Sequence, residues 1–391
     1  MSKIKEIYLR LCMSSVFSRV MEKPLIVALA NYCKDGITRD VKIKAYASFV
    51  NEIYTQGASL SALVCRLVLE DENVYIRAKA GKHELSECVA SATEYELKAF
   101  EELSRLTPED FASDMELSYT SPFVTEKIDF SREYENRIAN LDKYGYGIFS
   151  SYCMFRLSDD KTIEPIVSAD KTEMSKFVGY EQERQSVVDN TMSFIEGKTC
   201  TNILLCGDAG TGKSSTVKAV ANHFFNRGIR LIELRKDQLC YLPYVMGKIS
   251  ENPLKFIIFI DDLSFNKNDD NFSMLKAALE GSASAKADNA VIYATSNRRH
   301  IIKETFGDRV GDDVHRNDTL QENLSLSERF GLIVYFQKPN KALYLDIVRA
   351  LARRNGISLS EAELDVRAEA FALRRGSRSA RCAEQFIESL K

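Results

Sequence analysis

The sequence lacks the features that define several large classes of protein. Its nine cysteines are odd in number and nowhere spaced as C-x-x-C, which argues against a disulfide framework and against a zinc site. No run approaches the ~18 apolar residues of a membrane helix, and the start M-S-K-I-K-E-I-Y leads into no long apolar segment. We therefore expect a cytoplasmic protein with reduced thiols and no membrane partner.

An excess of charge of either sign is also lacking. The 53 basic and 56 acidic residues leave a formal net charge of −3, so net charge does not indicate a nucleic-acid partner, although local patches could still bind one. With 45% hydrophobic and 28% charged residues among 391, the chain can bury the cores of two or three globular domains.

What the sequence does contain is a phosphate-binding motif, G-D-A-G-T-G-K-S-S, which matches G-x-x-x-x-G-K-[ST] at every fixed position. An apolar run at Asn202–Cys206 and a helical pattern at Ser214–Phe225 supply the strand and helix that this P-loop (Walker A) motif requires. The glycines let backbone N–H groups turn toward phosphate oxygens. Lys213 would place its charge near the β- and γ-phosphates, and the Ser214 hydroxyl would bind Mg²⁺. The predicted nucleotide contacts are Gly207, Asp208, Ala209, Gly210, Thr211, Gly212, Lys213, Ser214 and Ser215.

Polar side chains follow two later predicted strands. A continuous apolar run from Lys255 ends in Asp261 and Asp262, and the strand Ala290–Thr295 is followed by Asn297. Because the carboxyl ends of parallel strands meet at one edge, we expect these side chains beside the phosphate loop. Asp261 would hold Mg²⁺ through its water shell, and Asp262 would polarise the attacking water. For these two acids the alternative is a solvated acidic turn. Asn297 would orient a water or contact the γ-phosphate.

The flanking regions predict two further domains. Residues 1 to about 120 have helical periodicity, with a helix start at Thr107, and their apolar positions fit a core better than a partner groove. Alternating residues 149–157 and 162–167 predict a β-hairpin. We place a mostly helical N-terminal domain at 1–170, an ATP-binding α/β core at 171–338 and a helical lid at 339–391.

The last helical segment carries a basic run, R-R-G-S-R-S-A-R, at residues 374–381. Such a run fits a solvated face, a nucleic-acid patch or a phosphate sensor, and we favour the sensor. A capping pattern, Ser360-x-x-Glu363, predicts the start of an earlier helix in the same region.

The ordered set from the phosphate loop to the helical tail resembles the AAA+ ATPases over about residues 176–391. Within that superfamily, F-I-D-D-L-S-F, Y-A-T-S-N-R-R-H and L-S-L-S-E-R-F-G-L are similar to an uncharacterised bacterial ATPase family, catalogued as a domain of unknown function, number 815. The resemblance implies a five-stranded parallel sheet sandwiched by helices, a C-terminal helical lid, ATP bound between core and lid, and a homo-oligomeric ring or partial ring.

The same resemblance implies roles for individual residues. Asn297 matches the sensor after the fourth strand, and Arg329 matches the arginine finger that reaches a neighbouring subunit. Arg378 matches the lid sensor, with Arg381 as the alternative. Val178 and Gly179 would lie beside the adenine. Many superfamily members have Glu where this chain has Asp262, whose carboxylate is one methylene shorter.

Two functions remain open from the sequence. The first is an ATPase that hydrolyses ATP to ADP and phosphate with Mg²⁺ and remodels a protein or protein–nucleic acid partner, held by the N-terminal domain. The second is a nucleotide-dependent binding switch with slow hydrolysis, similar to a helicase loader.

Overall fold

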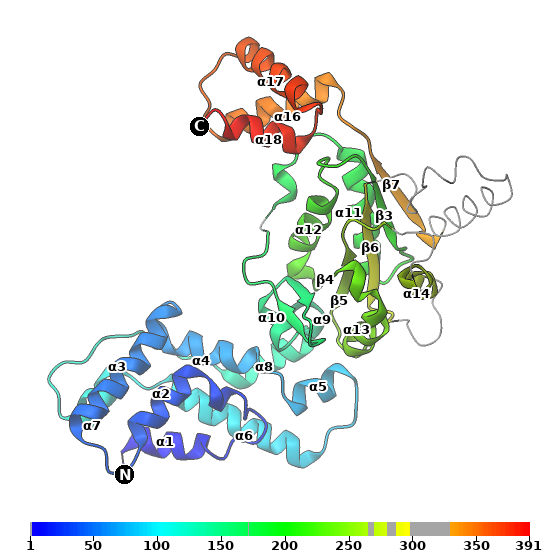
Figure 1. The fold of residues 1–391 in the computed structure, drawn as a ribbon. Coiled ribbons are helices and arrows are strands. Elements are labelled where there is room, and N and C mark those ends of the chain that lie inside the picture. The colour runs from blue at the N-terminus through cyan, green and yellow to red at the C-terminus, as the bar shows by residue number, and fades with distance from the viewer. Residues whose placement is uncertain (1, 171, 265–269, 280–286, 298–328) are drawn as a thin grey trace. The chain divides into compact units, whose positions relative to one another are not determined.

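The computed structural model describes residues 2–170, 172–264, 270–279, 287–297 and 329–391, and it forms two compact units, Met1–Ser151 and Tyr152–Lys391 (Figure 1). The described part of the first unit is helical. Its elements are α1 (Lys3–Leu11), η1 (Val20–Glu22), α2 (Pro24–Cys33), α3 (Arg39–Thr55), α4 (Leu60–Leu69), α5 (Val74–Ala80), α6 (Glu87–Ser104), α7 (Pro108–Met115), α8 (Phe130–Ala139), α9 (Leu141–Tyr144) and α10 (Ile148–Ser151). The prediction of helices for this region is confirmed.

One hydrophobic cluster joins most of these helices. Phe111 of α7 is fully buried, and its ring packs against Tyr32, Phe49 and Phe123. The helix that carries it begins where the sequence predicts, since Thr107 and Asp110 form a reciprocal capping box. The regularly spaced apolar residues of this region therefore form a hydrophobic core.

The second unit contains one seven-stranded sheet with the order β2-β1-β4-β5-β6-β3-β7. Its strands are β1 (Met154–Leu157), β2 (Ile163–Pro165), β3 (Ile203–Gly207), β4 (Ile229–Leu234), β5 (Lys255–Ile260), β6 (Ala290–Ser296) and β7 (Leu332–Phe336). Every pairing is parallel except the antiparallel pair β1–β2. The sheet thus has two more strands than the resemblance implies.

Helices cover both faces of this sheet. The remaining elements are η2 (Met174–Lys176), α11 (Glu181–Ile195), α12 (Lys213–His223), η3 (Phe225–Arg227), η4 (Lys236–Tyr241), α13 (Leu242–Ile249), α14 (Asp270–Leu279), α16 (Lys341–Arg354), α17 (Glu361–Arg375) and α18 (Ala380–Glu388). Val187 of α11 and Val217 of α12 pack on one face with Ile257 and Phe259 of β5. The alternate residue Ile258 is also fully buried, and α13 and α14 lie across the sheet from α12 (Figure 1).

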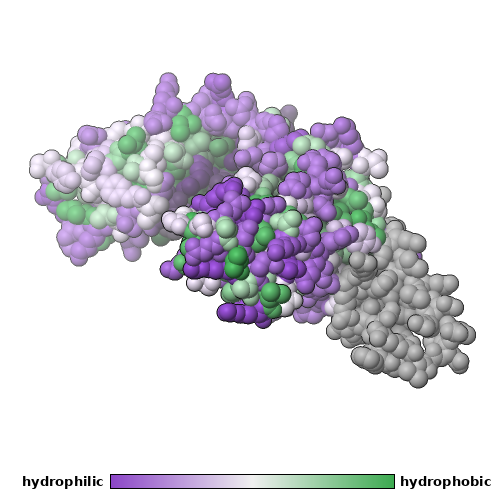
Figure 2. Space-filling model, turned by 90° about the horizontal axis from the view of Figure 1, so that it is seen from above, coloured by the Kyte–Doolittle hydropathy of each residue, from purple (hydrophilic) through white to green (hydrophobic). Residues whose placement is uncertain are grey.

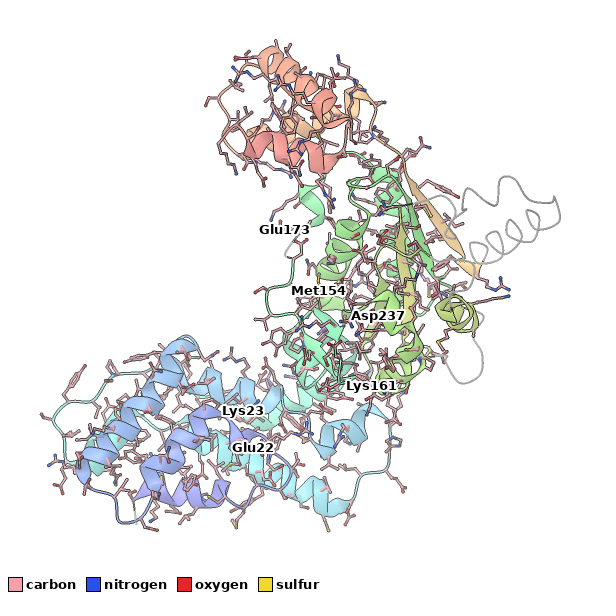
Figure 3. The ribbon with its side chains drawn as sticks, in the orientation of Figure 1. Glu22, Lys23, Met154, Lys161, Glu173 and Asp237 are labelled. Carbon is pink, nitrogen blue, oxygen red and sulfur yellow. The ribbon has the colours of Figure 1, made fainter. Side chains whose placement is uncertain are left out.

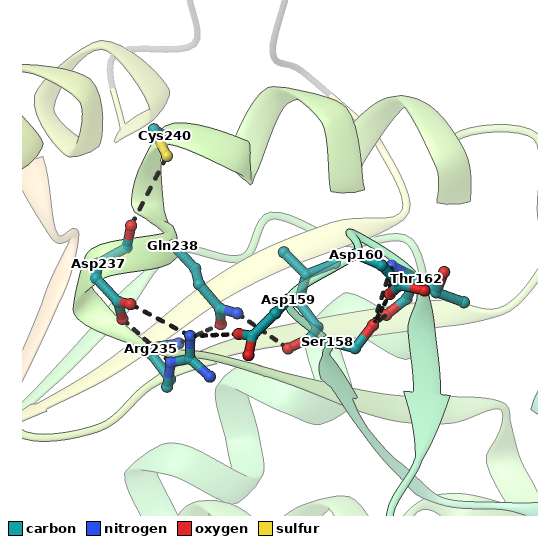
Figure 4. A network of polar contacts seen from close by, with 9 residues as sticks. Ser158, Asp159, Asp160, Thr162, Arg235, Asp237, Gln238 and Cys240 are labelled. Atoms are coloured by element: carbon teal, nitrogen blue, oxygen red, sulfur yellow. Dashed lines mark hydrogen bonds and ion pairs between the residues drawn. The ribbon is translucent and has the colours of Figure 1, made fainter.

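The predicted hairpin exists, but it belongs to the second unit. Met154 of β1 is buried in the core of that unit, and β1 extends its sheet through β4 (Figure 3). The hairpin is also bound to the start of η4. Arg235, which precedes η4, donates to Asp159 of the hairpin turn at 2.9 Å, and Gln238 of η4 donates to the carbonyl of Leu157 in β1 at 3.0 Å (Figure 4). The structure therefore differs from the boundary predicted at 170/171, and residues 149–151 are helical rather than extended.

The C-terminal helices α16–α18 have a hydrophobic cluster of their own, which includes Tyr344, Val348, Ala368 and Phe386. Ser360 caps α17 through the Glu363 N–H, as its spacing predicts. These helices lie in the same compact unit as the sheet, so the lid boundary at 338/339 stays a prediction.

The surface is predominantly hydrophilic on the face shown in Figure 2, where hydrophobic residues form small scattered groups. Among the described residues, no helix is both long enough and apolar enough to cross a membrane.

Candidate nucleotide-binding site

The P-loop runs from the end of β3 into α12, in the strand–loop–helix order that the motif requires. Gly207, Gly210 and Gly212 all have positive φ, at 142°, 75° and 91°. At Gly207 a Cβ would lie 2.0 Å from the Phe336 carbonyl oxygen of the neighbouring strand β7. Glycine is therefore required there both by the backbone angle and by close strand packing.

The Lys213 ammonium connects the loop to the end of β6. Its Nζ donates to the Gly207 carbonyl at 2.9 Å, the Asp208 carbonyl at 2.8 Å and the Asn297 Oδ1 at 3.0 Å. The side chain is 6% exposed, and this burial lowers the pKa of Lys213 from its usual value. No carboxylate forms an ion pair with Lys213 among the described residues, so its charge is available for a phosphate.

The acidic pair lies beside the P-loop, as the sequence predicts. Ser214 Oγ donates to Asp261 Oδ1 at 2.6 Å, which joins the start of α12 to the end of β5. Asp262 has the left-handed φ of 52°, and its Oδ1 accepts from Asn297 Nδ2 at 2.7 Å. The carboxyl edges of β3, β5 and β6 thus bring the motif and both acids together.

A cavity of about 460 Å³ opens over these residues, within the usual size of small-ligand sites. Many of the site residues predicted from the sequence line this cavity: Val178, Ala209, Gly210, Thr211, Gly212, Lys213, Ser214, Ser215, Asp261, Asp262, Asn297 and Arg381. Gly179 does not line it; a Cβ there would lie 2.3 Å from Leu343 Cδ1 of α16. Gly207 and Asp208 line a separate cavity beside the end of β7.

The two candidate lid sensors differ in position. Arg378 donates two hydrogen bonds, each 2.9 Å long, to the Glu369 carboxylate, and it does not line the cavity. Arg381 lines the cavity, and its N–H donates to the Gly210 carbonyl at 3.3 Å. The geometry therefore favours Arg381, the alternative in the sequence, over Arg378.

Arg329 lies away from this cavity. It precedes β7 and lines a different cavity of about 500 Å³ with Thr201 and Asn202, which precede β3, and with Ala290 at the start of β6. These residues occupy the amino-terminal ends of the strands, opposite the P-loop. Arg329 is thus outside its own nucleotide cavity, as expected of a finger. Two acids close to Arg329 in the sequence, Glu322 and Glu328, lie outside the described residues.

Sequence reasoning missed several cavity residues. Phe177, Ile347 and Leu351 supply an apolar wall suited to a base, but their spacing reads as ordinary core. Arg184 of α11 is 7% exposed, lies 4.3 Å from the Phe177 ring centre, and has a buried Nε without a partner among the described residues. Burial lowers the pKa of Arg184 to about 10, so it stays charged at neutral pH. The sequence feature that could have identified Arg184 is its position four residues, about one helical turn, after the segment F-V-G-Y at 177–180.

The donor set fits a magnesium nucleotide. Lys213 and the turned N–H groups of the P-loop suit phosphate oxygens, and the hard oxygen ligands of Ser214 and Asp261 suit Mg²⁺. The apolar side chains of Phe177, Ile347 and Leu351 in the same cavity suit a base. Together these residues can bind and orient a nucleotide triphosphate.

The P-loop on β3, the acids after β5 and the intervening strand β6 define a P-loop nucleotide-binding α/β fold, in which one strand separates the P-loop strand from the strand that carries the acids. The chain belongs to the family described as "Protein of unknown function (DUF815)", whose profile matches residues 150–391. No curated protein matches the sequence.

Among solved structures, the RuvB Holliday junction branch migration motor of Thermotoga maritima is similar at 11% identity and a TM-score of 0.35, covering 56% of this chain and 71% of that chain. A variant of the same RuvB is similar at 14% identity, with a TM-score of 0.35 and the same coverage.

Proposed function

We propose that this protein binds ATP with Mg²⁺ and hydrolyses it to ADP and phosphate. The observation that carries the proposal is the hydrogen bond from Ser214 Oγ to Asp261 Oδ1, because it joins the serine of the P-loop to an acid on another strand beside the Lys213 ammonium. A solvated acidic turn would not need this contact. A hydroxyl and a carboxylate this close can share one Mg²⁺, directly and through its water.

Each proposed catalytic residue has a separate task. Lys213 and the P-loop N–H groups bind the phosphates, and bound Mg²⁺ would neutralise charge on the β- and γ-oxygens. Asp262 accepts a proton from the attacking water, and Asn297 holds the Asp262 carboxylate in place through its Nδ2. Arg381 contacts the γ-phosphate from the first turn of α18.

We further propose a homo-oligomer, a ring or partial ring, in which Arg329 acts on the nucleotide of a neighbouring subunit. Its place outside its own cavity supports this role. The first unit, with its independent core, would bind a protein partner that the oligomer remodels, alone or on nucleic acid.

One observation favours a nucleotide-dependent switch as the second candidate. The Asn297 amide accepts from Lys213 and donates to Asp262, so the acid proposed to activate water is engaged with protein. Slow hydrolysis would follow if ATP leaves that contact intact.

The test is the steady-state rate of Mg²⁺-dependent ATP hydrolysis by the full chain, alongside ATP affinity by calorimetry. Lys213→Ala should abolish tight binding and turnover, because it removes the buried ammonium. The matched control is Lys218→Ala on the same helix, a lysine paired with Glu233 at 3.4 Å that does not line the cavity; it should keep both. A wild type that binds ATP with negligible turnover would favour the switch. Undiminished ATP affinity in Lys213→Ala would overturn the site.

A further inference from the structure

The Thr295 hydroxyl contacts both Asp261 and Asp262 from β6, the strand that pairs with β5. Thr295 belongs to β6, pairs with Leu205 of β3, and is 2% exposed. Its Oγ1 donates to Asp261 Oδ1 at 2.5 Å and accepts the Asp262 N–H at 3.0 Å. One buried hydroxyl therefore contacts both acids of the proposed site, the first through its side chain and the second through its backbone.

Three hydrogen bonds converge on one oxygen of Asp261. Oδ1 accepts from Ser214 Oγ, Thr295 Oγ1 and the Asp262 N–H, the last at 3.1 Å. Oδ2 accepts no hydrogen bond from the described residues. The carboxylate is thus held by one oxygen, and the other remains available to a water of a bound metal ion.

The same hydroxyl supports the left-handed turn at Asp262. A non-glycine residue with φ of 52° is uncommon and persists where its surroundings hold it. Here the Asp262 N–H is held by Thr295 Oγ1, and the next N–H, of Leu263, donates to the Thr295 carbonyl at 2.7 Å. This turn directs the Asp262 carboxylate to Asn297.

We propose that Thr295 is a positioning residue for the metal, whose hydroxyl orients Asp261 so that Oδ2 meets the water shell of Mg²⁺ and fixes the turn that places Asp262. This inference rests on the proposed function. Hydrogen-bond partners of metal-binding groups typically contribute 10- to 100-fold to metal affinity. Valine has the shape of threonine without its hydroxyl, whereas serine keeps the hydroxyl, so the two substitutions separate shape from hydrogen bonding.

The experiment measures Mn²⁺ affinity of the ADP-bound full chain by electron paramagnetic resonance, with Mn²⁺ in place of Mg²⁺, so it does not depend on turnover. Thr295→Val should weaken Mn²⁺ binding about tenfold or more, while ADP affinity in chelator stays within about twofold. Thr295→Ser should bind Mn²⁺ like the wild type. If Thr295→Val does not fold, Thr295→Ala, which also removes the hydroxyl and adds no bulk, replaces it.

The matched control is Thr191→Val. Thr191 is equally buried, and its hydroxyl bonds to Tyr293 and the Val187 carbonyl, away from the cavity. It should lower the melting temperature without changing Mn²⁺ affinity. Wild-type Mn²⁺ affinity in Thr295→Val, or an equal loss in Thr295→Ser, would overturn the positioning role alone. A wild type that binds no Mn²⁺–ADP would overturn the proposed function and this inference together.

Discussion

Replacing Arg381 with alanine is expected to weaken ATP binding, whereas the same change at Arg378 is expected to weaken only the fold. The two arginines lie three residues apart in the sequence, Arg378 in the segment between α17 and α18 and Arg381 in the first turn of α18, and their surroundings differ. Arg378 is bound to Glu369 by two hydrogen bonds, and that carboxylate raises the pKa of Arg378 above its usual value. Arg381 has no ion pair with a described residue and lines the cavity next to Gly210.

The expected magnitudes follow from these contacts. A hydrogen bond to a charged group contributes about 1.5–3 kcal/mol, so Arg381→Ala should raise the dissociation constant for ATP by about ten- to a hundredfold. Because a γ-phosphate sensor contacts only ATP, ADP affinity should change much less. The Arg378–Glu369 pair is 35% and 16% exposed, so solvent screens it and its loss should destabilise the unit only slightly. Thermal unfolding should show this as a small fall in melting temperature.

The assay is calorimetric titration of both variants with a non-hydrolysable ATP analogue and with ADP, paired with thermal unfolding. Each arginine serves as the control for the other, since both changes remove the same side chain from the same segment. The reasoning is refuted if Arg378→Ala loses affinity for the analogue while Arg381→Ala binds it like the wild type. The family-based assignment of Arg378 would then be correct.

Three more outcomes are expected. Gly207→Ala should destabilise the fold by about 2–5 kcal/mol in urea unfolding, because its Cβ would meet the Phe336 carbonyl and its φ is positive; Gly247→Ala in α13, where a Cβ meets no atom within 4 Å, should instead be neutral or stabilising. Asp262→Asn should keep ATP binding and lose hydrolysis, since an amide cannot accept the proton, and unchanged turnover would assign that role elsewhere. Arg329→Ala should bind ATP normally but lose ~10³-fold or more in rate, and mixing it with a Lys213→Ala chain should restore activity; no recovery beyond dilution would contradict a finger acting between subunits.

Local sequence was enough to predict most of the parts. The strands β5 and β6 fall where the apolar runs place them, because a buried strand needs only a short continuous apolar segment between turn residues. The caps at Thr107 and Ser360 are equally local, since each side chain bonds within its own first turn. The phosphate motif was sufficient to predict the roles of its glycines and its lysine, because the whole loop is one short segment whose residue spacing sets its geometry.

Tertiary structure alone decided what these parts contact. The hairpin strand β1 pairs with β4, about 75 residues later in the chain. Strands pair through backbone hydrogen bonds, which are nearly the same for every residue type, so the sequence does not show which strands pair. Arg378 and Arg381 look equivalent in a basic run, and the fold separates them, because Arg378 is bound to Glu369 whereas Arg381 lines the cavity. Thr295 reads as an ordinary strand residue, yet the parallel order of β5, β6 and β3 places its hydroxyl against both acids. Site residues that belong to one short segment could be predicted from the sequence. Contacts between neighbouring strands and helices could be identified only from the fold, because packing brings together residues whose separation in the sequence is arbitrary.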